Sequence, residues 1–293
     1  MLKEIKNDFV KFTNKYSTLN PWTNVYGLSR SIIAFSLLLT LIFSKTETLI
    51  MPENINNNSV FVTYNFFYCF SSIFFAKLTC IFLLAVVIFG YFPQITAILH
   101  WWVNLSFLFV CPLIEGGDQL NAIISFLMIP IALTDNRINH WHKPKYSKVQ
   151  NKKLIIWSMF FLISIQISFV YFHAGIAKLD VEEWLNGTAV YYWATHNIFG
   201  VNNSLFSALN YLFSFKFVVV LFTWGTIILE LFFFSFIFVK RNNWNWKIYL
   251  LLGVFFHFFI IVLFGLFSFF FSMLGAIILY YIPKENHISF NFK

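Results

Sequence analysis

The feature that most constrains this chain is a series of apolar runs, each about as long as a bilayer is thick. Four of them carry almost no charge: Val25–Ser44, Leu78–Leu99, Leu154–Leu179 and Phe217–Val239. An α-helix rises about 1.5 Å per residue, so about twenty residues cross the hydrocarbon core of a membrane. Charged residues make up only 11% of the chain, whereas soluble domains carry roughly 25%. We therefore predict an all-α integral membrane protein.

Two further apolar regions are predicted to form helical hairpins. Val103–Ile114 and Leu120–Leu133 are each shorter than a standard span, and a double glycine separates them. We expect a hairpin of two short or partly embedded helices there, with Asp118 as the N-cap of the second. Ile248–Ile282 is too long for one ordinary helix, and Gly265 near its middle favours a tight hairpin of two spans. A single long tilted helix is the alternative.

Other segments are expected to lie at the membrane surface. The lysine-rich N-terminus is interpreted as an amphipathic approach to the membrane, and His100–Trp102 as an interface belt. Val60–Phe75 carries polar residues and is interpreted as re-entrant or surface-lying, although a crossing stays open. Asp180–Ser214 is aromatic and is expected to contain an interfacial helix or lid. The whole is predicted to be one polytopic transmembrane helical bundle of about eight crossings, a single domain over residues 1–293.

Basic residues exceed acidic ones, with 20 Lys and Arg against 12 Asp and Glu and a net charge of +8. In a membrane protein this excess first indicates topology, because lysine and arginine collect on the cytoplasmic side. Asp135–Lys153 is rich in them, so we expect this loop and both chain termini to be cytoplasmic. No basic run carries base-stacking chemistry, so the expected partner is the lipid bilayer and not nucleic acid.

The three cysteines, Cys69, Cys80 and Cys111, form no C-x-x-C arrangement. Small buried hydrophobic residues are the simplest interpretation. One disulfide among them is the alternative, because the predicted outer face is oxidising. A thiol–disulfide active site is the least favoured interpretation.

Ionisable side chains inside a membrane are costly and by default mark function. Lys178, Glu230 and His257 stand out in the predicted spans. Glu230 and His257 lie at similar distances from the cytoplasmic ends of their spans, so we expect them at the same depth and able to pair. A structural hydrogen bond that fixes helix packing is one interpretation. A proton path or a ligand pocket is the other.

Lys178 closes the segment YFHAGIAKL. On a helix, Tyr171, Ala174, Gly175 and Lys178 share one face through steps of three and four. Small residues beside a lysine let another backbone or a substrate come close. Lys178 either snorkels to the outer headgroups or, as an amine neutralised by burial, acts as a base or nucleophile.

Two polar clusters have simpler interpretations. Glu115 and Asp118 flank the double glycine, where paired carboxylates either bind a cation or substrate or form a helix cap in a solvated loop. The cap is the simpler account. His140 and His142 are two residues apart and point in different directions on a helix, so we expect no metal site there.

Several segments, in their order along the chain, carry a family resemblance. They are NPWTNVYGLSRSIIA (Asn20–Ala34), HWWVNLSF (His100–Phe107), GGDQL (Gly116–Leu120), IPIALTDNRINHWH (Ile129–His142), YFHAGIAKL with EEWLNGTAVYYW (Tyr171–Trp193), the Glu230 span and the run Phe256–Tyr281. This set resembles the HTTM superfamily, which includes the membrane domain of the vitamin K-dependent gamma-carboxylase. Within it the chain is most similar to the sporulation-delaying protein B branch, bacterial membrane proteins needed for the maturation of small secreted peptide toxins.

The resemblance implies roles for particular residues. The carboxylase has a Y-F-x-A-G-x-x-K-L segment whose lysine is regarded as the base that deprotonates reduced vitamin K, and this lysine falls on Lys178. Reduced quinone is a cofactor implied by resemblance alone, and no metal is expected. The residues expected to be catalytic are Lys178, His257 and Glu230, and those expected to bind substrate are His173, Tyr171, Trp184, Glu115 and Asp118.

The chain also departs from the carboxylase pattern. The residue before the lysine, a second lysine in the carboxylase, is Ala177 here. The carboxylase has a large soluble domain after its membrane part, which contributes to propeptide and glutamate recognition, whereas this chain ends soon after its last predicted span. These differences put gamma-carboxylation in doubt.

Three functions are therefore open at this point. The first is the maturation, as an enzyme or otherwise, of a secreted antimicrobial or toxin peptide at the outer face, with the precursor peptide and a small maturation protein as partners. The second is a proton-coupled peptide exporter or an immunity protein without covalent chemistry, in which Glu230 and His257 would couple protons. The third is a structural subunit of a larger membrane complex.

Overall fold

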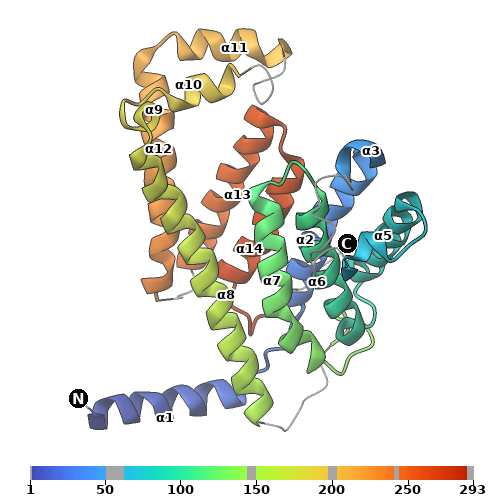
Figure 1. Cartoon of the computed structure of the whole chain (residues 1–293). Helices are drawn as coiled ribbons and strands as arrows, with labels where there is room; N and C mark the ends of the chain where they lie inside the picture. Colours follow the sequence, from blue (N-terminus) through green and yellow to red (C-terminus); the bar gives the residue numbers. More distant parts are fainter. Residues whose placement is uncertain (1, 51–62, 144–149, 197–202, 241–243, 289–293) are drawn as a thin grey trace, which may run out of the picture. The chain divides into compact units, whose positions relative to one another are not determined.

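The chain is mostly α-helical in the part that the computed structural model describes, residues 2–50, 63–143, 150–196, 203–240 and 244–288 (Figure 1). These residues contain no β-strand beyond an isolated antiparallel bridge between Tyr91 and Asn139. The chain divides into two compact units: unit 1 is Met1–Ile163 with Phe271–Lys293, and unit 2 is Ser164–Phe270. The all-α fold is confirmed, and the single domain over residues 1–293 stays a prediction.

The helices of unit 1 are α1 (Leu2–Thr18), α2 (Asn24–Phe43), α3 (Thr46–Leu49), the 3-10 turn η2 (Phe66–Tyr68), α5 (Ile73–Ile88), α6 (Pro93–Val110) and α7 (Gly116–Leu133). Two helices have residues in both units, α8 (Gln150–Ala177) and α14 (Phe267–Tyr281). Those of unit 2 are η3 (Lys178–Asp180), α9 (Glu182–Leu185), α10 (Ala189–Ala194), α11 (Asn203–Phe213), α12 (Lys216–Ser235), η4 (Phe236–Phe238) and α13 (Asn245–Phe264).

Among the described residues, five helices are long and apolar enough to cross a membrane, namely α2, α7, α8, α12 and α13. Helices α5 and α14 are apolar but shorter. This supports a multi-pass membrane protein. The count of about eight crossings and the cytoplasmic location of both termini stay predictions.

Three predicted spans and one hairpin match the structure. Helix α2 falls on the first predicted span, α8 on the third, and α12 with η4 on the fourth. Gly265 separates α13 from α14 with a φ of 67°, a left-handed conformation that glycine adopts at little cost. The long apolar run is therefore two helices, and the single tilted helix is excluded. The N-cap of α2 is Thr23, whose hydroxyl accepts from the Val25 amide.

The predicted span Leu78–Leu99 is wrong, because the chain turns in its middle. Gly90 and Phe92 have φ values of 85° and 46°, and Pro93 begins α6. The Phe92 amide donates to the Ile138 carbonyl at 2.7 Å, which holds the turn against a later segment. Glycine and proline break the helix here although the hydropathy stays high. His100 is consequently a buried residue within α6 and not part of an interface belt.

Helices α6 and α7 form the predicted hairpin, but neither is short. Helix α6 begins at Pro93, and α7 is long enough to span. The N-cap of α7 is Glu115, and Asp118 occupies the third helical position, where Oδ2 accepts from the Glu115 amide at 3.1 Å. The prediction that Asp118 is the N-cap is therefore wrong. Glu115 is the N-cap, and Asp118 is its partner in a capping box, in which each carboxylate accepts from the backbone amide of the other residue.

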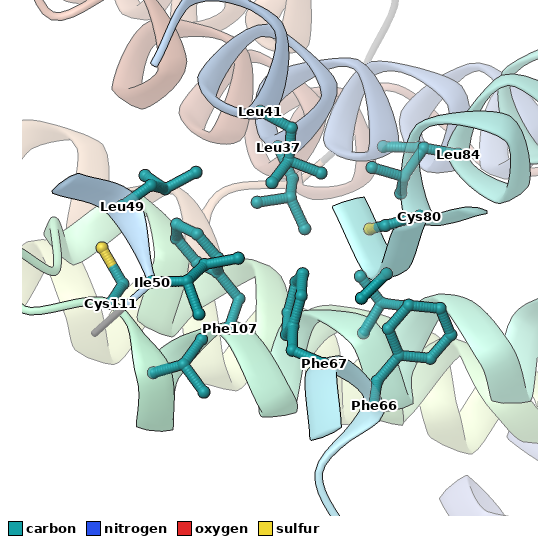
Figure 2. Close-up of a cluster of buried hydrophobic side chains, with 14 of the residues drawn as sticks. Leu37, Leu41, Leu49, Ile50, Phe66, Phe67, Cys80, Leu84, Phe107 and Cys111 are labelled. Atoms are coloured by element: carbon teal, nitrogen blue, oxygen red, sulfur yellow. The ribbon is translucent and has the colours of Figure 1, made fainter. Parts of the chain in front are cut away.

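An apolar cluster forms part of the core of unit 1. Figure 2 shows its side chains pointing toward one another from α2, α3, η2, α5 and α6. Cys80 and Cys111 belong to this cluster, and Cys69 is exposed. All three cysteines are free. Their interpretation as small buried hydrophobic residues is confirmed for Cys80 and Cys111 and is wrong for Cys69. Burial raises the pKa of the Cys111 thiol above its ordinary value, so it stays protonated.

The basic segment after α7 is not a simple solvated loop. Arg137 donates to both oxygens of Asp135, and the shortest of these contacts, from Nη2 to Oδ2, is 2.7 Å. Tyr26 also donates to Asp135 Oδ2. Burial acts to lower the pKa of Arg137, but the hydrogen bonds and charge of Asp135 raise it above its ordinary value. Arg137 is one of the basic residues that led us to expect a cytoplasmic loop. Its positive charge is neutralised by Asp135 inside the fold.

The predicted surface segments are short helices and turns. Residues 60–62 lie outside the described residues, and residues 63–75 contain η2 and the start of α5, with Phe66 and Phe67 buried. The described residues of this segment hold no spanning helix. The N-terminal segment is helical as predicted, and its end contacts α8, where Lys153 Nζ donates to the Thr18 carbonyl.

Helices α2 and α14 approach closely at Gly275. Ser29 Oγ donates to the Gly275 carbonyl at 2.7 Å, and Ser36 and Ser272 share a hydrogen bond of 2.7 Å further along. A Cβ at Gly275 would lie 2.5 Å from Ile33 Cγ1 and 3.1 Å from the Ser29 carbonyl oxygen. Small residues of this kind let helix backbones pack without a side chain between them.

We predict that Gly275→Ala destabilises the protein by about 1–3 kcal/mol, because the new methyl group overpacks the contact with α2. Gly225→Ala in α12 is the matched control, since nothing lies within 4 Å of its added Cβ, and it should be neutral or slightly stabilising. Thermal unfolding of the purified protein in detergent measures both. Equal shifts for the two variants would show that the α2–α14 contact does not depend on a glycine.

Candidate functional site

An ion pair between Lys178 and Glu230 is the centre of the candidate site in unit 2. Lys178 Nζ lies 2.8 Å from Glu230 Oε1 and 2.7 Å from Oε2. The side chains are 20% and 10% exposed. Because both charges are mostly withdrawn from solvent, each depends on the other for its stability. Lys178 therefore does not simply snorkel to the headgroups.

The predicted face of α8 is the face that builds this pair. Tyr171 and Gly175 are buried along it, and Lys178 follows one turn later. A Cβ at Gly175 would lie 3.0 Å from Leu231 Cδ2 and 3.6 Å from Glu230 Cβ. The glycine thus lets α12 come near enough for the carboxylate to reach the ammonium. The expectation that a small residue beside Lys178 admits another helix is confirmed.

The Lys178 ammonium has a third hydrogen-bond acceptor besides the two carboxylate oxygens. Its Nζ lies 3.1 Å from the Ala174 carbonyl oxygen, one turn earlier on α8. An ammonium group has three N–H donors and no acceptor. All three donors of Lys178 are therefore used within the protein.

Trp184 covers the ammonium from the aromatic segment. Lys178 Nζ lies 5.2 Å from the centroid of the Trp184 ring, within the range of a cation–π contact. Helix α9, which carries Trp184, begins directly after the 3-10 turn that contains Lys178. The predicted combination of Lys178 and Trp184 is thus present.

Helices α9 to α11 lie beyond the ends of α8 and α12 in Figure 1, as a cover made of short pieces. Val190 and Ala194 of α10 pack with Val219 of α12, and the Val190 amide donates to Thr223 Oγ1 at 3.3 Å. Gly187 turns the chain between α9 and α10 with a φ of 80°. The segment WLNGTAVYYW therefore forms two short helices, because Asn186 and Gly187 interrupt it. It is not one continuous interfacial helix, and the alternative of a lid stays a prediction.

His257 lies beside Tyr171 and does not pair with Glu230. The rings of Tyr171 and His257 are 6.0 Å apart, and Tyr171 also contacts Phe233 at 5.2 Å. His257 Nδ1 donates to the Gly253 carbonyl at 2.7 Å. The predicted Glu230–His257 pair is wrong, because equal depth on two helices does not determine which faces meet. Among the described residues His257 contacts the Tyr171 ring and the Gly253 carbonyl, and the Glu230 oxygens accept from Lys178 instead.

Three other residues were expected to bind substrate. His173 is exposed on another face of α8, where its ring lies 6.3 Å from that of Phe169. Glu115 and Asp118 belong to unit 1 and form the start of α7. Their roles in substrate binding stay predictions.

Two curated proteins of Bacillus subtilis (strain 168) match nearly the whole chain. The uncharacterized protein YitO is 36% identical over 301 residues, covering 100% of this chain and 94% of YitO. The sporulation-delaying protein SdpB is 35% identical over 282 residues, covering 94% of this chain and 86% of SdpB. The chain belongs to the SdpB family. No family model matches the chain and no solved structure does, so the wider resemblance to the HTTM superfamily stays a prediction.

Sequence reasoning found the members of this site in the SdpB-family chain but missed how they pair. Lys178 and Glu230 were each recognised as costly charges, and their opposite signs were the signal that could have joined them. A further buried charge was missed altogether: Arg30 in α2 is 1% exposed. An arginine inside a predicted span is by itself the signal that could have found it.

We predict that Lys178→Met destabilises the protein by on the order of 3 kcal/mol, because the Glu230 carboxylate keeps its desolvation cost and loses its partner. The double variant Lys178→Met with Glu230→Leu should recover most of this loss, since it removes both charges. Chemical unfolding in detergent micelles measures the difference.

The control is Lys216→Met, which removes an exposed lysine at the start of α12 and should change stability by less than about 0.5 kcal/mol. A double variant as unstable as the single one would mean that the pair is not the source of the effect.

Proposed function

We propose that this chain is a membrane-embedded maturation factor for a secreted antimicrobial or toxin peptide, and that the peptide is handled where Trp184 covers the Lys178–Glu230 pair. The observation that carries the proposal is this charge pair. It lies where the apolar helix α8 ends and the short helices η3 and α9 begin. Two charges in such a place are costly, and a pure packing role would be filled at lower cost by apolar side chains.

The relatives support this reading at the level of the family. SdpB, which is 35% identical, is named for delaying sporulation, and the resemblance described above implies the maturation of a small secreted peptide toxin. The proposed partners are accordingly a secreted precursor peptide and a small maturation protein, with the chemistry at the outer face of the membrane and both termini inside.

The geometry limits what Lys178 can do as a base. In the paired state the ammonium holds its proton and its three donors are used. Proton transfer from Nζ to a Glu230 oxygen, 2.7 Å away, would give a neutral amine and a neutral acid with no net change of charge. Only then can the amine accept a proton from a substrate, with Glu230 holding the first proton.

In the paired state the donor set of Lys178 does not fit the quinone that the resemblance implies. A quinol hydroxyl needs a free amine lone pair, and a quinone oxygen needs a free N–H, but Lys178 offers neither while its three N–H groups are bound to Ala174 and Glu230. We therefore derive no step through a quinone. The proposed role of the pair is to bind the peptide and hold a proton beside it.

The exporter or immunity alternative rested on a proton-coupling pair of Glu230 and His257. The described residues hold no such pair, since both Glu230 oxygens accept from Lys178. The geometry therefore gives no support to proton coupling through Glu230 and His257.

We predict that Lys178→Met and Glu230→Gln each lower the amount of mature secreted peptide at least tenfold, because either change removes one member of the pair. The assay uses host cells that lack the native gene and express each variant, with mass spectrometry of all small peptides in the medium. Lys216→Met is the control and should leave the peptide pattern unchanged.

Membrane levels of each variant are matched by immunoblot, so that loss of folding is not read as loss of function. Wild-type levels of mature peptide from Lys178→Met would rule out the proposed site. Cells that lack the protein, release the peptide at unchanged mass and are killed by it would instead establish the immunity role.

We predict a separate effect for the aromatic cover. Trp184→Leu should lower the mature peptide severalfold, because it removes the indole face over the ammonium, whereas Trp184→Phe should retain part of the activity. Trp193→Leu changes an exposed tryptophan of α10 and serves as the matched control in the same mass-spectrometric assay. Equal losses for Trp184→Leu and Trp193→Leu would indicate a general role of surface aromatics instead.

A further inference from the structure

Arg30 in unit 1 is a buried cation whose hydrogen bonds are incomplete. It lies in the second turn of α2 and is 1% exposed. Its Nη2 donates to Thr96 Oγ1 at 2.6 Å. Within the described part of the chain, no acceptor lies within hydrogen-bonding distance of its Nε or Nη1. Buried donors of this kind are rare in folded proteins, and those of a charged group are the most costly.

The carboxylate whose charge acts on Arg30 does not neutralise it. Asp135 lies close enough for its charge to act on Arg30, but its two oxygens already accept from Arg137 and Tyr26. Two guanidinium groups thus share one carboxylate. With all three ionised, the cluster of Arg30, Asp135 and Arg137 carries one excess positive charge inside unit 1.

The imidazoles around Arg30 add donors but no negative charge. The charge of Arg30 acts on both His100 and His140. Burial, and then the charges of Arg30 and Arg137, lower the pKa of His140 to about 2, so this imidazole is neutral. His140 Nδ1 and His100 Nε2 are buried and have no partner among the described residues.

Helix α6 carries two of these groups on one face. Thr96 and His100 are four residues apart, so they are neighbours on the helix surface. Because Thr96 contacts the Arg30 guanidinium, His100 lies one turn along the same face. The single O–H of Thr96 is shared between the carbonyls of Tyr91 and Phe92, so its oxygen is fixed in place as an acceptor for Arg30.

We propose that Arg30 binds a small anion, a halide or a carboxylate, which accepts hydrogen bonds from Nη1–H and the second Nη2–H at the end of the guanidinium and from the ring N–H of His100. The planar guanidinium presents several N–H groups in a fixed fork that suits such an acceptor. The bound anion would cancel the excess charge of the cluster. It would also join α2 to α6, so anion binding stabilises the folded form of unit 1.

The test uses the full-length protein, purified in detergent micelles in sodium gluconate. Chloride or formate replaces gluconate at constant sodium concentration, and the thermal unfolding midpoint is measured. We expect the midpoint to rise by several degrees with either chloride or formate and to level off at saturation. A rise with formate alone also supports the proposal and assigns a carboxylate as the ligand.

Variants distinguish anion binding at Arg30 from a general effect of salt on the unfolding midpoint. Arg30→Gln should abolish the rise, and Arg30→Lys, which keeps the charge but not the fork, should retain part of it. Lys216→Gln, at an exposed lysine of α12, should respond as the wild type does. A midpoint that changes with neither anion, or a response that Arg30→Gln preserves, would overturn the proposal.

A direct binding measurement keeps the proposal testable if Arg30→Gln does not fold. Radioactive chloride is equilibrated with the wild-type protein, and bound counts are competed with unlabelled formate. Saturable, competed binding supports the anion site. Absence of saturable binding would show that water alone completes the hydrogen bonds of Arg30.

Discussion

The pairing of buried charges is the constraint on which much of this structure depends. In an apolar environment an ionised side chain is tolerated only beside a partner, so each pair determines which helix faces meet. In unit 2, Lys178 and Glu230 join the end of α8 to α12. The neighbouring turns follow the same register: Tyr171 packs on Phe233, and Ser168 Oγ donates to the Phe234 carbonyl. Residues with lower numbers in α8 contact residues with higher numbers in α12, so the two helices run antiparallel.

Close approach of backbones makes these pairs possible, and glycine provides it at two places. Gly175 faces Leu231 beside the Lys178–Glu230 pair, and Gly275 faces Ile33 within unit 1. Gly225 has no neighbour within 4 Å, so a glycine in these helices does not by itself mark a contact. Attraction between helices in a membrane comes from packing and hydrogen bonds, because lipid tails are as apolar as leucine. Short side chains at the contact therefore matter as much as the charges.

Much of the fold could be predicted from the sequence. The lengths of the apolar runs indicate which segments can span a membrane, and Gly265 indicates where one long run divides into two helices. The face of α8 that holds Tyr171, Gly175 and Lys178 followed from helical periodicity alone. The partner of Glu230 did not follow, since depth along a span says nothing about which way a side chain points. The break at Gly90 was hidden because hydropathy stays high on both sides of it. Arg30 was overlooked because one charge barely changes the mean hydropathy of its run.

The two charged sites differ in what they leave for a ligand. Lys178 has no remaining donor, so an anionic or carbonyl group could bind it only by displacing Ala174 or Glu230. The Glu230 oxygens are different, because each accepts one bond from Nζ and a carboxylate oxygen can accept two. A peptide entering beneath Trp184 would therefore be held first through its own N–H donors, with the carboxylate as acceptor. Arg30 has the opposite character, since its unused groups are donors and select an acceptor that carries negative charge.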